Sequence, residues 1–122
     1  MKKSTKVIGA LVGVGILVGL AFDLVNKEAR GLEILNDRAG LAVDCTVRKH
    51  LGESWGVCRY LNGAPASVWL KRGEVWISAN GNALELLDRL AKVPADQLQG
   101  LPKVAQDREQ PPSMPDEILR QG

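Results

Sequence analysis

The sequence has few of the residue types on which enzymes and metal proteins depend. His50 is its only histidine, and Cys45 and Cys58 are its only cysteines. No carboxylate is placed to orient His50, and the chain contains neither a nucleophile elbow nor a glycine-rich phosphate loop. The cysteines lack the paired C-x-x-C spacing that is typical of zinc sites. We therefore expect no catalytic residue, no cofactor and no enzymatic activity.

Most of the chain also lacks a large net charge of either sign. The sequence has 16 basic and 14 acidic side chains, but Lys2, Lys3 and Lys6 all precede the first apolar run. The remainder is close to neutral and has no basic cluster that would neutralise phosphates. Nucleic acid is therefore excluded as an expected partner.

One long apolar run, VIGALVGVGILVGLAF at residues 7–22, has no polar side chain. The lysines before it predict a cytoplasmic N-terminal region over residues 1–6 and an extracytoplasmic domain after the run. Residues 7–25 would extend roughly 28 Å as a helix, close to the thickness of the hydrocarbon layer. We predict a transmembrane anchor there, in the bacterial inner membrane. The alternative is a signal peptide cleaved after Ala21, which would leave a periplasmic or secreted protein.

Glycines within this run indicate how such a helix would associate with other helices. Gly9 with Gly13, and Gly15 with Gly19, form two small-xxx-small pairs that permit close approach of helix backbones. The two pairs fall on different faces of the helix. The sequence therefore predicts an oligomer contact in the membrane through one pair or the other.

A first hairpin is predicted in residues 41–61, because one register satisfies several preferences at once. Pairing Cys45 with Cys58 puts both cysteines on the apolar face. The same register pairs Asp44 with Arg59, Arg48 with Trp55, and Val43 with Tyr60. Two facing cysteines in an exported chain predict a disulfide. The alternative is a metal site formed by Cys45, His50 and Cys58, which would need a reducing compartment.

A second hairpin is predicted in SVWLKRGEVWIS, residues 67–78, which is nearly symmetric about Arg72 and Gly73. Because Gly73 readily takes a positive φ, we place the turn at these two residues. The predicted pairs are Lys71 with Glu74, Leu70 with Val75, Trp69 with Trp76, and Val68 with Ile77. One face is then aliphatic, and the other carries two tryptophans among polar side chains.

The tryptophans are the strongest indication of a binding site. All three fall on the less aliphatic face of their hairpins, and two arginines accompany the first of them. Aromatic side chains beside arginine are typical of surfaces that bind sugars, peptides or proteins. The alternative is that a helix covers this face and makes the tryptophans part of the core. The predicted binding residues are Arg48, Trp55, Arg59, Trp69 and Trp76.

Helices are expected on both sides of the hairpins in the sequence. Residues 26–40 have apolar positions at helical spacing and end at Gly40, which predicts a juxtamembrane helix. Residues 79–94 predict a second helix, capped by Asn82 and ended by Pro94. Residues 94–122 hold five of the six prolines and predict a flexible tail.

Together these elements predict an α+β fold. A single transmembrane helix precedes a four-stranded antiparallel meander in residues 41–93, with the second helix packed on its aliphatic face. The predicted function is that of a small membrane-anchored envelope protein acting as a non-enzymatic binding or assembly factor, whose partners are the membrane and an envelope protein. The alternative is a secreted or periplasmic inhibitor-like module that uses the tryptophan surface, and a small hydrolase is a third possibility.

Overall fold

The computed structural model describes residues 26–120. No helix among these residues has the length and apolarity that crossing a bilayer requires. The predicted membrane span over residues 7–25 lies outside the described residues, and so do its four glycines, Gly9, Gly13, Gly15 and Gly19.

The described chain forms an α+β fold around one sheet. A helix over residues 26–38 precedes β1 (Val43–His50), β2 (Glu53–Tyr60), β3 (Pro65–Arg72), β4 (Val75–Ser78), α2 (Gly81–Leu90), the 3-10 helix η1 (Ala95–Leu98), β5 (Lys103–Ala105) and α3 (Asp116–Arg120). The strand order is β1-β2-β3-β4-β5, and β5 runs parallel to β4 while the other neighbours are antiparallel.

The predicted four-stranded antiparallel meander is therefore wrong, because the sheet has five strands and is mixed. The additional strand comes from the proline-rich segment that we predicted to be a flexible tail. β5 has only three residues, too few to show the alternation by which a strand is recognised in a sequence. It is aligned by its parallel partner and by the crossover through α2, neither of which is a local feature.

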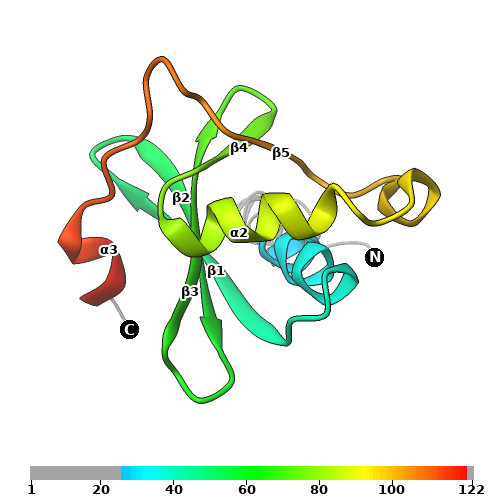
Figure 1. Ribbon diagram of the computed structural model, residues 1–122. Coiled ribbons are helices and arrows are strands. Elements are labelled where there is room, and N and C mark those ends of the chain that lie inside the picture. Colours follow the sequence, from blue (N-terminus) through cyan, green and yellow to red (C-terminus); the bar gives the residue numbers. More distant parts are fainter. Residues whose placement is uncertain (1–25, 121–122) are drawn as a thin grey trace, which may run out of the picture.

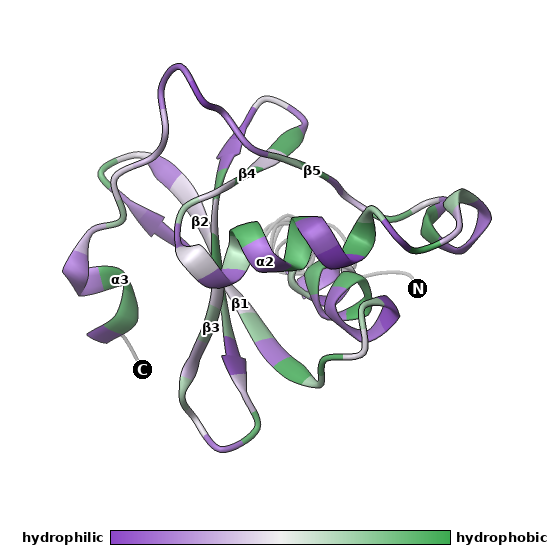
Figure 2. Ribbon diagram, viewed as in Figure 1, coloured by the Kyte–Doolittle hydropathy of each residue, from purple (hydrophilic) through white to green (hydrophobic). Residues whose placement is uncertain are grey.

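Helices lie on both faces of the sheet (Figure 1). The helix over residues 26–38 and α2 lie on one face, in a core cluster that includes Trp69, Trp76 and both cysteines. α3 lies on the opposite face, against the aliphatic side chains of β2 and β3. The prediction that α2 covers the aliphatic face is wrong, since its buried residues belong to the tryptophan cluster. Figure 2 shows the alternating polar and apolar bands that mark α2 as amphipathic.

The ends of the two longer helices are set by local hydrogen bonds. Gly40 has a φ of 86°, and its N–H donates to the Asp37 carbonyl while the Leu41 N–H donates to the Asn36 carbonyl. This Schellman pattern is the helix stop expected at Gly40. α2 is capped by Asn80, whose side-chain oxygen accepts from the Ala83 N–H at 2.9 Å. The predicted cap at Asn82 is therefore wrong by two residues.

The first hairpin has the predicted register throughout. Cys45 pairs with Cys58, Asp44 with Arg59, Arg48 with Trp55, and Val43 with Tyr60. The predicted disulfide between Cys45 and Cys58 is present. Leu51 and Gly52 form the two-residue loop, and both have a positive φ, of 51° and 82°. Two positive φ values are the pattern of a type I′ turn, which matches the twist of the flanking strands.

The second hairpin differs from its predicted register. Trp69 pairs with Ser78 and Lys71 with Trp76, so the two tryptophans are diagonal neighbours and not opposite. The loop consists of Gly73 and Glu74, and the positive φ of 63° belongs to its first residue. This is the pattern of a type II′ turn, which suits a hairpin without forcing Arg72 into a positive φ. Each partner shifts by two residues, so every side chain keeps its predicted face.

Gly56 permits a close approach between the sheet and the helix over residues 26–38. A Cβ atom on Gly56 would lie 2.5 Å from Leu32 Cδ1 and 3.3 Å from the Trp76 ring. Both neighbours are themselves buried. We expect Gly56→Ala to lower the free energy of unfolding by about 1–3 kcal/mol, because the enclosed Leu32 must shift. Urea denaturation measures this change. Gly81→Ala is the control, since a Cβ there meets nothing within 4 Å, and equal stability of the two variants would contradict the prediction.

Candidate functional site

The face of the sheet opposite the two longer helices carries a small apolar patch, which we call the cradle. Its floor consists of Trp55 and Val57 from β2 and Val68 and Leu70 from β3. The register places Trp55 opposite Leu70 and Val57 opposite Val68, so all four side chains project from the same face. Arg48, His50 and Arg59 have positions on this face and form its rim, together with two acidic residues, Asp44 opposite Arg59 and Glu53 opposite His50.

The C-terminal segment of the chain occupies the cradle. Ile118 of α3 has no exposed surface and belongs to the same cluster as the four floor residues. Met114 and Leu119 pack against this cluster from its edge. The segment thus presents one fully enclosed branched aliphatic side chain, with two apolar side chains beside it.

Polar contacts from the rim hold the segment in place. Arg59 Nη2 donates to the carbonyl oxygen of Leu119, while Nη1 donates to the Gly63 carbonyl at 3.2 Å. His50 Nε2 lies 4.0 Å from a carboxylate oxygen of Glu117. Arg59 therefore recognises the backbone of the occupant, and His50 faces an acidic side chain.

Two buried polar atoms of the cradle have no partner within residues 26–120. They are Arg48 Nε and Trp55 Nε1, which belong to directly opposed residues of β1 and β2. Leaving a buried donor unsatisfied costs about 1–3 kcal/mol. Both groups are hydrogen-bond donors, so this side of the cradle is suited to an occupant that carries an acceptor.

The structure separates the predicted binding residues into two groups. Arg48, Trp55 and Arg59 come together at the cradle, whereas Trp69 and Trp76 lie on the other face of the sheet. All three tryptophans are buried, so they do not form the exposed surface that we expected from the sequence. A helix covers Trp69 and Trp76, as the alternative interpretation held.

The buried tryptophans of the second hairpin have structural partners. Trp69 Nε1 donates to Ser67 Oγ at 2.9 Å, and Lys71 Nζ lies 5.7 Å from the centre of the Trp76 ring. Lys71 also forms an ion pair with Glu28 of the first helix. These contacts join the helix to the sheet, and they leave neither ring available to a ligand.

The sequence interpretation missed most of the cradle. His50 was interpreted as a possible metal ligand, and the aliphatic floor was expected to lie under α2. Ile118 lies in a polar, proline-rich segment. The available signal was PDEIL at residues 115–119, where a proline and two acids precede two apolar residues at the start of a short helix.

The alternative metal site does not form. Cys45 and Cys58 are joined to each other and nearly inaccessible, and thiolate ligands need free sulfur atoms. His50 faces Glu117. Among residues 26–120, no group of three or more His, Cys, Asp or Glu side chains is arranged to hold a metal ion.

The segment before α3 is attached to the sheet at one main point. Arg72 Nη1 donates to Asp107 Oδ2 at 2.9 Å and to the Gln110 carbonyl at 2.6 Å. The other carboxylate oxygen of Asp107 accepts from the N–H groups of Gln110 and Glu109. The Gln110 N–H, with smaller contributions from the Glu109 N–H and Arg72, holds the pKa of Asp107 below its ordinary value, although partial desolvation opposes this shift.

We expect this attachment to weaken in acid. Because the pKa of Asp107 is lower in the folded state, the ionised carboxylate stabilises the fold above the unfolded-state value of 3.8. That contribution is lost as the pH falls through the lower, folded-state pKa. A carbon-detected NMR titration of Asp107 should give a midpoint below 3.8, and Asp107→Asn should remove the matching change in the Ile118 methyl shift. A midpoint at or above 3.8 would contradict the assignment.

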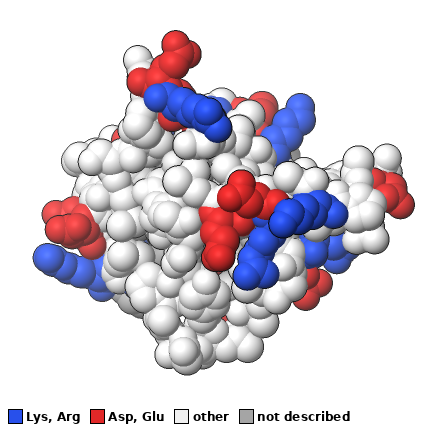
Figure 3. All heavy atoms as spheres, viewed as in Figure 1, with Lys and Arg blue, Asp and Glu red and all other residues white. Residues whose placement is uncertain are grey.

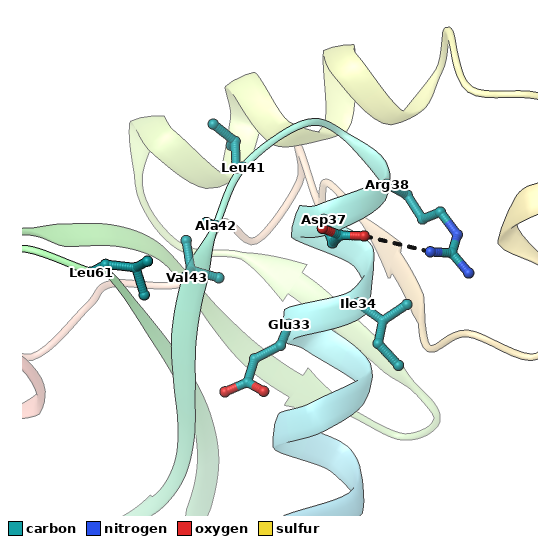
Figure 4. A pocket seen from close by; sticks show the side chains of 8 residues that line it. All are labelled: Glu33, Ile34, Asp37, Arg38, Leu41, Ala42, Val43 and Leu61. Atoms are coloured by element: carbon teal, nitrogen blue, oxygen red, sulfur yellow. Dashed lines mark ion pairs between the residues drawn. The ribbon is translucent and has the colours of Figure 1, made fainter.

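A hollow of about 430 Å³ lies between the first helix and the edge of β1 (Figure 4). Its carboxylates are already engaged. Glu33 points toward β1 and accepts the Cys45 N–H at 2.8 Å, and Asp37 lies 3.6 Å from Arg38. Glu33 therefore accepts from a backbone N–H of the edge strand β1 that no neighbouring strand pairs with, so its role is structural.

On the molecular face in Figure 3, acidic and basic side chains lie close together and not in patches of one sign.

Comparison of this chain with models of protein families, with curated proteins and with solved structures found no match. What the cradle binds must therefore be argued from its own chemistry. That chemistry consists of an apolar floor that encloses Ile118, a histidine that faces an acidic side chain, and an arginine that donates to a backbone carbonyl.

Proposed function

We propose that this protein is a non-enzymatic binding module that acts in assembly through the cradle. Its ligand is a short protein segment with a branched aliphatic residue next to acidic residues. The observation that supports this proposal is the complete burial of Ile118, part of a five-residue helix, on a floor of four apolar residues. A sheet face that already encloses one such segment has the shape and polarity to receive another.

The chemistry of the cradle matches this class of ligand. The floor excludes water around one aliphatic side chain, which contributes about 1.5–3 kcal/mol on burial. Arg59 donates to a main-chain carbonyl, so the contact is independent of the ligand's side chain at that position. His50 faces the Glu117 carboxylate, and the unpartnered donors of Arg48 and Trp55 favour an acceptor, which supplies specificity.

The disulfide supports a location outside the cytoplasm. Cytoplasmic thiols are kept reduced, whereas exported proteins retain disulfides. We therefore propose that the partner is another extracytoplasmic protein. The alternative of an inhibitor-like module with an exposed tryptophan surface is not favoured, because the three rings are buried.

Emptying the cradle tests the proposal. In full-length Ile118→Asp, the charged side chain cannot remain in the apolar site, so the cradle should become available. A fluorescent peptide with the sequence of residues 112–120, PSMPDEILR, should bind this variant, as measured by fluorescence anisotropy. Binding to the unaltered protein should be at least about tenfold weaker, because the resident segment leaves only a small fraction of cradles empty.

Two controls make the result specific. The same peptide with aspartate in place of isoleucine should not bind, and Leu84→Asp, at an exposed position of α2, should behave like the unaltered protein. Circular dichroism checks that each variant is folded. A folded Ile118→Asp variant that does not bind PSMPDEILR would overturn the proposed function.

A further inference from the structure

Two buried indole groups of the sheet differ in whether residues 26–120 supply them with an acceptor. Trp55 and Trp69 are both enclosed, with 2% and 0% of their surface exposed. The Trp69 indole N–H donates to Ser67 Oγ at 2.9 Å, whereas the Trp55 indole N–H has no acceptor. The Trp55 ring belongs to the cluster that encloses Ile118. The unpartnered donor is therefore part of the cradle and not of the opposite face.

Arg48 brings a second unpartnered donor to the same place. Its Nε atom is buried without an acceptor, and within the described part of the chain its guanidinium forms no ion pair. Arg59, on the same face, donates to the carbonyl oxygens of Gly63 and Leu119. The register places Arg48 directly opposite Trp55. Because side chains of directly opposed residues project together, the two donors are suited to share one acceptor.

The carboxylates near the cradle do not supply this acceptor. Glu117 of the resident segment faces His50 at 4.0 Å, and its side chain is 60% exposed. Glu53 lies two positions from Trp55 on the same face, but it is exposed and forms no ion pair within residues 26–120. The resident segment therefore fills the apolar part of the cradle and leaves its two buried donors unused.

We infer that the ligand of the cradle carries, beside its branched aliphatic residue, a carboxylate that accepts from Arg48 Nε and Trp55 Nε1, and that this ligand displaces α3. This inference rests on the proposed function of the cradle. A carboxylate accepts both hydrogen bonds and also neutralises the guanidinium, and such charge-assisted hydrogen bonds are stronger than neutral ones. A carboxamide oxygen would accept the same bonds but leave the charge of Arg48 unpaired.

Displacement of α3 requires an advantage of this kind. Because α3 is part of the same chain, it competes for the cradle at a high effective concentration. A ligand that only repeated the contacts of the resident segment would bind at a disadvantage. Satisfying buried donors that α3 leaves unpartnered strengthens binding by about 5–150-fold, which offsets that disadvantage. In the absence of the ligand, α3 keeps the apolar floor covered.

A glutamate scan of the peptide PSMPDEILR tests this inference on full-length Ile118→Asp. Each peptide has glutamate in place of one residue other than the isoleucine and the two acids, or added at one end. We expect one of these peptides to bind at least about fivefold more tightly than PSMPDEILR, by fluorescence anisotropy. Glutamine at the same position should give a smaller gain. The Trp55 indole proton resonance should move downfield with this peptide only, because its N–H then gains an acceptor.

Two further variants show whether the gain comes from the two donors. Adding Arg48→Met to Ile118→Asp keeps the aliphatic stem and removes the guanidinium, so the gain should be lost. Adding Trp55→Phe should reduce it. Both should bind PSMPDEILR as tightly as Ile118→Asp alone, because the resident segment leaves these donors without an acceptor. Circular dichroism checks that each variant is folded. In the unaltered protein, the best peptide should shift the Ile118 methyl resonance as α3 leaves the cradle.

The outcomes separate this inference from the proposed function. If no glutamate peptide binds more tightly than PSMPDEILR, or if the gain persists in the Arg48→Met variant, the carboxylate site is overturned. A gain that leaves the Ile118 methyl resonance of the unaltered protein unmoved would overturn the displacement of α3. If PSMPDEILR itself binds Ile118→Asp in these cases, the cradle remains a binding site for an aliphatic segment. If neither PSMPDEILR nor any glutamate peptide binds, the proposed function fails as well.

Discussion

Replacing Trp69 by alanine should lower the free energy of unfolding by about 3–5 kcal/mol. Trp69 is fully buried at the centre of the cluster that joins the sheet to both longer helices. The substitution removes the largest kind of apolar side chain and leaves a cavity between packed elements. It also leaves Ser67 Oγ, which is buried and accepts from the indole N–H, without that partner. Urea denaturation followed by circular dichroism measures the loss.

A matched substitution separates cavity formation from a general loss of apolar surface. Leu84 lies on α2 but is exposed, so Leu84→Ala should change the free energy of unfolding by no more than about 0.5 kcal/mol. The loss in free energy of unfolding for Trp69→Phe should lie between those of Trp69→Ala and Leu84→Ala, because phenylalanine retains most of the ring volume. If Trp69→Ala is as stable as Leu84→Ala, the tryptophan cluster is not the core of this domain.

Removing the disulfide should have the second large effect. We expect Cys45→Ala with Cys58→Ala to lower the free energy of unfolding by about 3 kcal/mol, since the cysteines are 13 positions apart and close a short ring. In a domain of this size, with a total stability of about 5–15 kcal/mol, that is a substantial fraction. The sulfur atoms also lie in the core, next to the Asn36 side chain, so the variant loses some packing as well.

Reduction of the unaltered protein supplies the control for this prediction. A thiol reductant strong enough to open the bond should lower the unfolding midpoint of the unaltered protein and leave that of the double variant unchanged. Alkylation and intact mass confirm that the bond is open. Equal midpoints of the unaltered protein with and without its disulfide would contradict the stabilising role.

The two hairpins show why one register was predicted correctly and the other was not. In the first, the cysteine pair, the charge pair of Asp44 with Arg59, and the apolar alternation all select one alignment. In the second, the sequence is symmetric enough for two alignments that place the same residues on each face. The conformation of the turn decides between them, because only Gly73 in the first loop position combines a positive φ with a hairpin twist.

The candidate site shows a different limit. The alternation of side chains along the first hairpin correctly placed Trp55, Arg48 and Arg59 on the face opposite the two cysteines. These three residues could therefore be predicted as neighbours from the sequence. Alternation within each hairpin does not say how one hairpin aligns with the next. The pairing of Gly56 with Trp69 puts Trp55 and Trp69 on opposite faces, and that alignment is a contact between hairpins.

The sequence by itself determined the features that depend on neighbouring residues: the first hairpin and its disulfide, the helix end at Gly40, and the faces of each strand. These follow from turn geometry, capping and the two-residue period of a strand, which act over a few positions. Only the tertiary structure decided which helix covers which face, that residues 103–105 form a fifth strand, and that Ile118 fills the cradle. The sheet has two apolar faces, and several apolar segments of the chain could cover either of them. Which segment covers which face depends on the total apolar surface that the whole arrangement buries, and no local sequence pattern contains that information.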